Sequence, residues 1–261
     1  HLELFCGTHS FGKVSSSMGF NVYSLDRDLG AECPFGSGYV SKNHIQADIM
    51  TWDYKQFKPG FFKIITASPV CLWWSHLRNS NIGRKLKGMD RPLTKQDIQN
   101  DIKKFGIPMV DKVFEIINYL KPPYFIIENP QTGKMKEYIN ELIPFYDVDY
   151  CKYGFEYQKR TRFWTNSENF KPLICHKDCD SIITIKTQPG DFHPSNNPIK
   201  SSIRKLHSGT ISFRKKKAIK RHNEQIGLSK KNIWDGSQIL QRYKKYKIPK
   251  KLIKDFFLCI K

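Results

Sequence analysis

Acidic residues are scarce in this chain: 24 Asp and Glu stand against 44 Lys and Arg, which gives 261 residues a net charge of +20. A small soluble domain needs a net charge of only about 2–8 to stay in solution, so solubility does not account for the excess. The excess predicts a polyanionic partner, and nucleic acid is the usual one. A membrane surface is the other common polyanion, but the sequence shows no basic amphipathic helix with a broad apolar face.

Long apolar runs and internal repeats are absent as well. No stretch approaches the ~18 consecutive apolar residues of a transmembrane helix, so we expect no membrane association. The first residues lack the basic segment and long apolar region of a signal peptide, and we expect an intracellular protein without a leader. The seven cysteines, an odd number, do not indicate a disulfide framework and fit a reducing compartment.

The first residues predict a strand, a glycine turn, a helix and a second strand in succession. The strand covers Leu2–Cys6, Gly7 opens the turn, the helix covers Phe11–Met18, and the next strand, Phe20–Leu25, ends at Asp26. This order is typical of a nucleotide-binding unit, in which the acid accepts hydrogen bonds from ribose hydroxyls. Only one glycine stands where the dinucleotide fingerprint has three, so a plain turn and a solvated aspartate remain the alternative.

Three more predicted strands end in residues that can perform chemistry. Asp48 falls near the end of a short strand over residues 45–49, Cys71 follows a strand over 61–66, and Glu128 follows a strand over 124–127. In an open α/β sheet, the carboxyl ends of the strands form the ligand-binding edge. The alternatives are a turn aspartate, a buried free cysteine and a glutamate that caps a helix over residues 132–142.

Basic residues also gather in a long loop and in a later strand. Residues 76–106 form a long polar loop with Arg78, Arg84 and Lys85, which either closes over a phosphate backbone or is a solvated surface. A strand over residues 157–164 carries three polar side chains that we expect on one face, suited to phosphates or a base edge: Gln158, Arg160 and Arg162.

Residues 167–245 are polar and basic, and they predict a second lobe that grips nucleic acid through runs such as Arg214, Lys215 and Lys216. Residues 1–166 then form the catalytic and cofactor-binding domain, and residues 246–261 form a helix that packs back on it. Cys175, His176 and Cys179, with His193 or His207 downstream, are candidate zinc ligands. Their spacing is not that of a zinc finger or ribbon, so no metal is predicted.

Taken together, the motifs resemble the DNA cytosine-5 methyltransferases, most closely the short forms of phages and large DNA viruses. Leu4–Gly7, Ser68–Cys71, Glu128–Pro130 and Gln158–Arg162 occur in the order and rough spacing of that family. The resemblance covers about residues 2–166. It implies an α/β fold, a mostly parallel doubly wound sheet of the class I S-adenosylmethionine-dependent type, with a smaller basic target-recognition lobe.

The resemblance also implies an activity and its residues. A monomeric enzyme would transfer a methyl group from S-adenosylmethionine to carbon 5 of a flipped-out cytosine in double-stranded DNA, leaving S-adenosylhomocysteine. The nucleophile would be Cys71; Glu128 would hold ring nitrogen N3, with Arg160 and Arg162 supporting the base and the catalytic loop. The cofactor would be bound by Phe5, Gly7, Thr8, His9, Asp26, Asp48, Ile49 and Pro69.

Departures from the family pattern leave alternatives open. The usual Pro-Pro-Cys-Gln reads Pro69-Val70-Cys71-Leu72 here, so the glutamine after the nucleophile is missing. An inactive nucleic-acid-binding relative is therefore one alternative. The same chemistry on RNA is another, because relatives of this family methylate transfer RNA. A methyltransferase that modifies an amino group is disfavoured, because its signature requires an aromatic residue at position 71.

Overall fold

The computed structural model describes most of the chain: residues 1–27, 41–139, 143–188, 202–209, 219–221, 224 and 247–260. Two compact units divide the chain between them. The large unit comprises His1–Asp147, Arg160–Pro172 and Ile253–Lys261, and the small unit comprises Val148–Lys159 and Leu173–Leu252.

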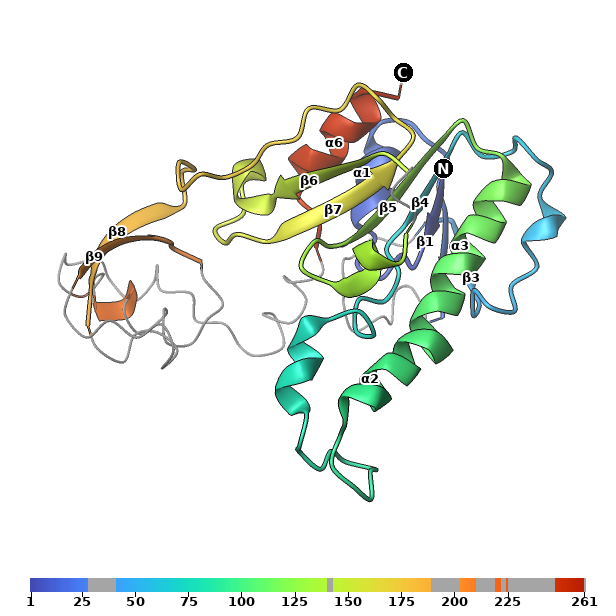
Figure 1. Cartoon of the computed structure of the whole chain (residues 1–261). Coiled ribbons are helices and arrows are strands. Elements are labelled where there is room, and N and C mark those ends of the chain that lie inside the picture. The colour runs from blue at the N-terminus through green and yellow to red at the C-terminus, as the bar shows by residue number, and fades with distance from the viewer. Residues whose placement is uncertain are drawn as a thin grey trace. The chain divides into compact units, whose positions relative to one another are not determined.

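A seven-stranded sheet organises the large unit, with strand order β3-β2-β1-β4-β5-β7-β6 (Figure 1). Strands β3, β2, β1, β4 and β5 pair in parallel, and β7 pairs antiparallel with β5. The expected α/β fold with a mostly parallel sheet is confirmed. The strands are β1 (Leu2–Leu4), β2 (Tyr23–Asp26), β3 (Asn43–Gln46), β4 (Ile64–Ala67), β5 (Tyr124–Pro130), β6 (Phe145–Asp149) and β7 (Arg160–Thr165).

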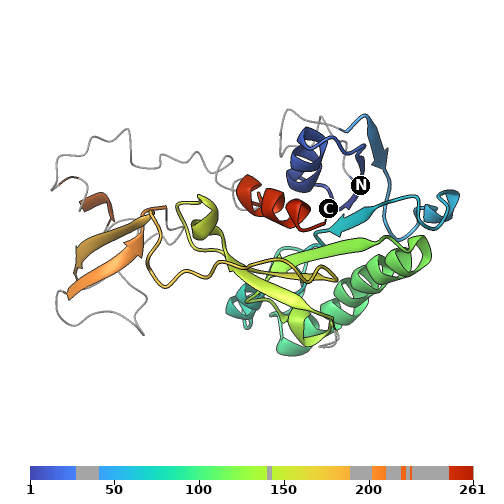
Figure 2. The same cartoon turned by 90° about the horizontal axis from the view of Figure 1, so that it is seen from above.

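Helices cover both faces of this sheet. In Figures 1 and 2, α3 (Ile107–Leu120) lies on one face, and α1 (Ser10–Ser17) and α6 (Lys250–Leu258) lie on the other. A further helix, α2 (Lys95–Asp101), begins at a capping box on Thr94 and continues through a π-helical turn, η3 (Ile102–Gly106), into α3. The sheet is therefore doubly wound, as expected.

The core between α3 and the sheet follows from the apolar spacing of both. Residues Val110, Val113, Ile117 and Leu120 recur at helical intervals and pack in one cluster with strand residues such as Ile65. Burying one such side chain contributes about 1.5–3 kcal/mol, so the helix and the strands stabilise each other.

Aromatic side chains hold α6 in the large unit. The Phe256 ring stacks on Phe170 with centroids 3.7 Å apart and lies 5.0 Å from the ring of Phe163 in β7. The Phe257 ring meets His1 edge to face at 5.4 Å. The helix thus contributes core side chains to the sheet face opposite α3.

The prediction of a helix over residues 132–142 is wrong for residues 132–139, the part of that range that the structure describes. The structure has a single 3-10 turn there, η4 (Lys134–Glu137), after an extended Gly133. The reason is tertiary: the Lys134 amide donates to the Trp74 carbonyl at 2.8 Å, which draws this segment toward the loop after β4. The third strand is also displaced from the expected 45–49 to Asn43–Gln46, so that Asp48 lies beyond its end.

The small unit contains an antiparallel hairpin of β8 (Ile182–Thr187) and β9 (Ser202–His207). Its described core cluster is modest, with Ile185 and Ile219 buried. The predicted DNA contacts Arg214, Lys215 and Lys216 lie outside the described residues. Among the residues that are described, none of the helices has the length and apolarity to span a membrane.

Candidate active site

The segments that follow β1, β2, β4 and β5 carry the predicted cofactor and catalytic residues. These four strands are neighbours and run parallel, so their carboxyl ends lie at one edge of the sheet. Ligands of open α/β sheets bind at this edge. The topology therefore brings to one place residues that are far apart in the sequence.

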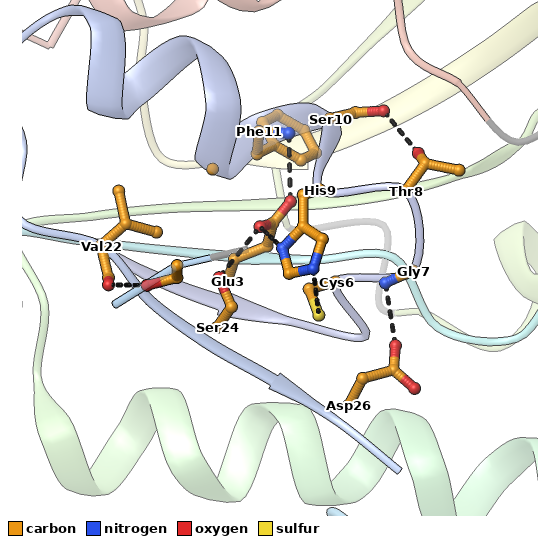
Figure 3. Close-up of polar contacts among 12 residues, drawn as sticks. Glu3, Cys6, Gly7, Thr8, His9, Ser10, Phe11, Val22, Ser24 and Asp26 are labelled. Atoms are coloured by element: carbon orange, nitrogen blue, oxygen red, sulfur yellow. Dashed lines mark hydrogen bonds and ion pairs between the residues drawn. The ribbon is translucent and has the colours of Figure 1, made fainter. Parts of the chain in front are cut away.

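The turn after β1 is tightly wound (Figure 3). Phe5, Gly7 and His9 all have positive φ, at 56°, 42° and 51°. Non-glycine residues adopt this conformation only where the surroundings enforce it, and such positions cluster at functional sites. The Gly7 amide donates to Oδ2 of Asp26 at 2.9 Å, which joins the turn to the end of β2. Of the predicted cofactor residues, Gly7 and Asp26 are thus in direct contact.

A buried glutamate in β1, Glu3, holds this turn in place, although no sequence pattern indicates this role. Glu3 accepts hydrogen bonds from the Phe11 amide at 3.0 Å and from the Ser24 hydroxyl at 3.4 Å. Figure 3 shows the His9 ring between Glu3 and Cys6, with Nδ1 3.7 Å from Glu3 Oε2 and Nε2 3.8 Å from Cys6 Sγ. The carboxylate therefore accepts from an amide in the first turn of α1 and contacts the histidine of the turn after β1.

Replacing Gly12 with alanine should destabilise the protein, because a Cβ at Gly12 would lie 2.5 Å from Oε2 of Glu3 and 3.3 Å from Val22. Glu3 is buried and hydrogen-bonded, so it cannot move without leaving the Phe11 amide unpaired. We expect a loss of about 1–3 kcal/mol in the free energy of unfolding, despite the higher helix propensity of alanine.

Chemical denaturation of the full chain measures this loss. The matched control is Ser16→Ala, an exposed position on the same helix, which should change the unfolding free energy by less than about 0.5 kcal/mol. Equal stability of the two variants would show that the contact with Glu3 imposes no constraint.

Asp48 and Ile49, two of the predicted cofactor residues, lie after β3. The Asp48 carboxylate accepts from the Met50 amide at 2.9 Å, and its side chain is exposed. The Ile49 side chain is buried and belongs to the core cluster beside α3. Asp48 is therefore an exposed carboxylate on a turn, and Ile49 anchors that turn to the core.

The loop after β4 carries Cys71, which is half-buried. This loop is bound to the end of β5 by the buried Asn129, whose amide nitrogen donates to the Pro69 carbonyl at 2.9 Å. Farther along, the Lys134 amide bonds to the Trp74 carbonyl at 2.8 Å. One hydrogen bond on each side of Cys71 thus attaches this loop to the segment that carries Glu128.

Glu128 lies within β5 and is 7% exposed. In the parallel pairing, Ile127 is the partner of Ala67, the last residue of β4, so Glu128 is the first residue of β5 beyond that pairing, where the loop toward Cys71 begins. In the antiparallel pairing with β7, Glu128 is opposite Phe163 and Asn129 is opposite Arg162. Since side chains alternate along a strand, Glu128 and Arg162 leave opposite faces of the sheet.

Arg162 has partners of its own. Its Nε and Nη2 donate to the two oxygens of Asp147 at 2.7 and 2.8 Å, and its guanidinium lies 3.6 Å from the centre of the Phe145 ring. Strand β7 begins at Arg160, so the predicted sharing of one strand face applies to the two arginines but not to Gln158, which precedes the strand and is exposed.

Aromatic contacts hold the part of the loop that follows Cys71. Trp73 stacks on Phe105 at 4.7 Å, and buried Trp74 stacks on Tyr138 at 5.8 Å. Partial burial raises the pKa of Tyr138 to about 12, and its hydrogen bond to Asp111 acts in the same direction. The phenol therefore stays a neutral donor at physiological pH.

The predicted DNA contacts within residues 76–106 differ in their surroundings: one is paired and two are exposed. The Arg78 guanidinium pairs with Asp101 and lies over the Trp73 ring, so this arginine braces the loop. Arg84 and Lys85 are exposed, and both can reach a phosphate.

Three potential metal ligands, Cys6, His9 and His44, gather beneath the first turn, with ligand atoms within 4.8 Å of one another. The contacts of His9 with Glu3 and Cys6 give these side chains a packing role in the turn. A second group of potential ligands lies in the small unit.

Comparison with known proteins gives one match that identifies a relative. Over 177 residues, 67% of this chain and 73% of the relative, the chain is 42% identical to a Frog virus 3 (isolate Goorha) protein described as "Probable DNA (cytosine-5)-methyltransferase". No protein-family model matches.

Two solved structures match the chain to different extents. The Entamoeba histolytica methyltransferase EhMeth, at 13% identity, matches 99% of this chain and 96% of its own with a TM-score of 0.52, which shows a shared fold. The S. pombe Dnmt2 methyltransferase, at 17% identity and a TM-score of 0.38, matches 68% of this chain, which spans about half (52%) of that protein.

Proposed function

This chain belongs to the DNA (cytosine-5)-methyltransferase family, as its four sequence motifs predicted, and we propose that it methylates carbon 5 of cytosine in double-stranded DNA through a covalent adduct on Cys71. The observation that carries the proposal is the bond between Asn129 and the Pro69 carbonyl. It ties the loop of the proposed nucleophile to the strand of the proposed acid, Glu128, at the ligand-binding edge of the sheet.

The residues at the first turn fit S-adenosylmethionine. A positive-φ turn at Gly7 lets a ligand approach the backbone closely, and the Asp26 carboxylate at the end of β2 suits ribose hydroxyls. When bound, the cofactor supplies an electrophilic methyl group on its sulfonium sulfur. The chain's own contribution is to hold the cofactor through the segments after β1, β2, β3 and β4. The remaining proposed contacts are Phe5, Thr8, His9, Asp48, Ile49 and Pro69.

Cys71 and Glu128 divide the chemistry between them. The Cys71 thiolate adds to carbon 6 of the base and breaks the 5,6 double bond, so electron density moves to carbon 5. Glu128 holds a proton at N3 and stabilises the charge that develops on the ring. After carbon 5 has taken the methyl group, it loses its proton to solvent water and the sulfur leaves carbon 6 as a thiolate. The double bond then forms again, and the proton at N3 returns to Glu128.

The arginines of β7 and the basic loop complete the proposal. Arg160 supports the base and the catalytic loop, while Arg162 acts as a positioning residue that holds β6 to β7 through Asp147. Extruding a cytosine costs a few kcal/mol, which phosphate contacts can offset. The exposed Arg84 and Lys85, together with Gln158 and the net charge of +20, support this grip on DNA. A monomeric state and an intracellular site of action belong to the same proposal.

Transfer of a radiolabelled methyl group from S-adenosylmethionine to defined substrates tests the proposed function. The full chain is incubated with duplex DNA and with RNA of the same sequence, and bisulfite sequencing then locates the modified base in the DNA. We expect label in the duplex, at cytosines that resist conversion.

Label confined to RNA would overturn the assignment of DNA as the substrate. Tight binding of duplex DNA without transfer to either nucleic acid would indicate a binding protein that has lost catalysis.

A further inference from the structure

The small unit brings together three thiols and an imidazole that lie far apart in the sequence. The ligand atoms of Cys151, Cys175, Cys179 and His207 all lie within 4.8 Å of one another. We propose that these four residues bind a structural zinc ion. The proposal goes beyond the catalytic function and does not depend on it.

The geometry of the cluster fits tetrahedral zinc. With Zn–S near 2.3 Å and Zn–N near 2.0 Å, a tetrahedral site has a sulfur-to-nitrogen edge of about 3.6 Å. The Cys175 sulfur and Nε2 of His207 are 3.6 Å apart. A set of three cysteines and one histidine is a common ligand set for closed, structural zinc sites, and thiolates favour zinc over magnesium or calcium.

The chain around the cluster is shaped to present these ligands. Between Cys175 and Cys179, Lys177 takes a left-handed φ of 62°, which turns the chain back on itself. The Cys175 amide donates to the buried Asp149 carboxylate at 2.9 Å, which fixes one ligand's backbone. The Ser181 hydroxyl lies 3.2 Å from the Cys179 sulfur, where it can donate to a thiolate in the outer shell of the metal.

The four ligands come from three separate stretches of the small unit. Cys151 lies in a 3-10 turn, η5 (Tyr150–Tyr153), Cys175 and Cys179 precede β8, and His207 is the last residue of β9. Zinc would therefore clamp the hairpin to the segment before it. The described apolar cluster on this hairpin has Ile185 and Ile219 as its buried members, and a metal would add to the stability of so small a cluster.

Zinc binding requires no oxidant or reductant, and its charges and protons balance. The three thiols lose their protons to solvent, and one Zn²⁺ with three thiolates and a neutral histidine forms a site of net charge −1. The cysteines remain reduced throughout, which agrees with their description as free thiols.

The sequence had suggested a different ligand set and no metal. His176 follows Cys175 directly, but its side chain is exposed and outside the cluster. His193 lies outside the described residues. Cys151 had carried no signal, because it belongs to an apolar segment before β7 and joins the other ligands only in the folded chain.

Metal analysis of the full chain, purified without added chelator, tests the proposal. We expect about one zinc per molecule, loss of most of it in His207→Ala and in Cys179→Ser, and full retention in His176→Ala and Cys259→Ser. The first control removes the neighbouring histidine, and the second removes a half-buried thiol of the large unit.

Cobalt substitution keeps the proposal testable if a variant folds poorly. In the wild-type protein, cobalt in place of zinc should give tetrahedral absorption bands with strong thiolate charge transfer, and the control variants should match it. Wild-type protein that holds no zinc and gives no such bands would overturn the proposal. Iron in place of zinc, a disulfide among the three cysteines, or equal zinc loss in His176→Ala and His207→Ala would do the same.

Discussion

Cys71→Ala is expected to lower methyl transfer to DNA by a factor on the order of 10³ or more, with cofactor affinity nearly unchanged. Without the sulfur, nothing adds to carbon 6, and carbon 5 of cytosine is too electron-poor to attack a sulfonium methyl group. The cofactor contacts proposed after β1 and β2 are separate from this side chain, so its removal leaves them in place.

Single-turnover transfer and calorimetric binding of the cofactor measure the two effects. The matched control is Cys259→Ala, the same substitution at a half-buried thiol just after α6, which should transfer methyl groups at the wild-type rate. DNA with 5-fluorocytosine at the target should form a covalent complex with the wild-type protein and with Cys259→Ala but not with Cys71→Ala. Turnover by Cys71→Ala close to that of the wild type would rule out the covalent mechanism.

Glu128→Gln is expected to lower the rate of methyl transfer by about 10²–10⁴-fold. Glutamine has nearly the same size and can still hydrogen-bond to the base, but it has no acidic proton to place on N3. The negative charge that Cys71 pushes into the ring then develops without a partner, and trapping on 5-fluorocytosine should slow in parallel.

The control for Glu128→Gln is Glu137→Gln, an exposed glutamate nine residues later in the chain, which should leave the rate unchanged. Replacing one carboxyl oxygen by an amide nitrogen at a buried position can also lower the stability of the protein. Thermal unfolding of both variants therefore separates a catalytic effect from a structural one. If Glu128→Gln transferred at the wild-type rate, the role of this carboxyl at N3 would be refuted.

The arrangement of the sheet was predictable from the sequence because its strands are short buried runs and its long helix has a clear apolar face. The helix α3 begins at Ile107 and ends at Leu120, close to the apolar spacing that predicted it. The helix expected after Glu128 failed for the opposite reason. Its propensity was overridden by a hydrogen bond from Lys134 to the Trp74 carbonyl, a contact across more than fifty residues of chain.

The site was predictable to the extent that its residues follow strand ends. The positions of Cys71, Glu128 and Asp26 near the carboxyl ends of β4, β5 and β2 follow from their place in the sequence. The partners of the site residues could not be predicted in this way. The sequence predicts Glu3 only as a strand residue, and the ion pair of Arg162 with Asp147 depends on strand β6 lying beside β7.

By itself, the sequence determined the basic charge, the order of strands and helices, and the family, since each of these depends on composition or on residues close together in the chain. Only the tertiary structure decided which side chains meet. Cys151 and His207 join Cys175 and Cys179 because the small unit folds three stretches onto one point. No local sequence pattern predicts this cluster, because a metal site depends on distances between side chains and not on their spacing along the chain.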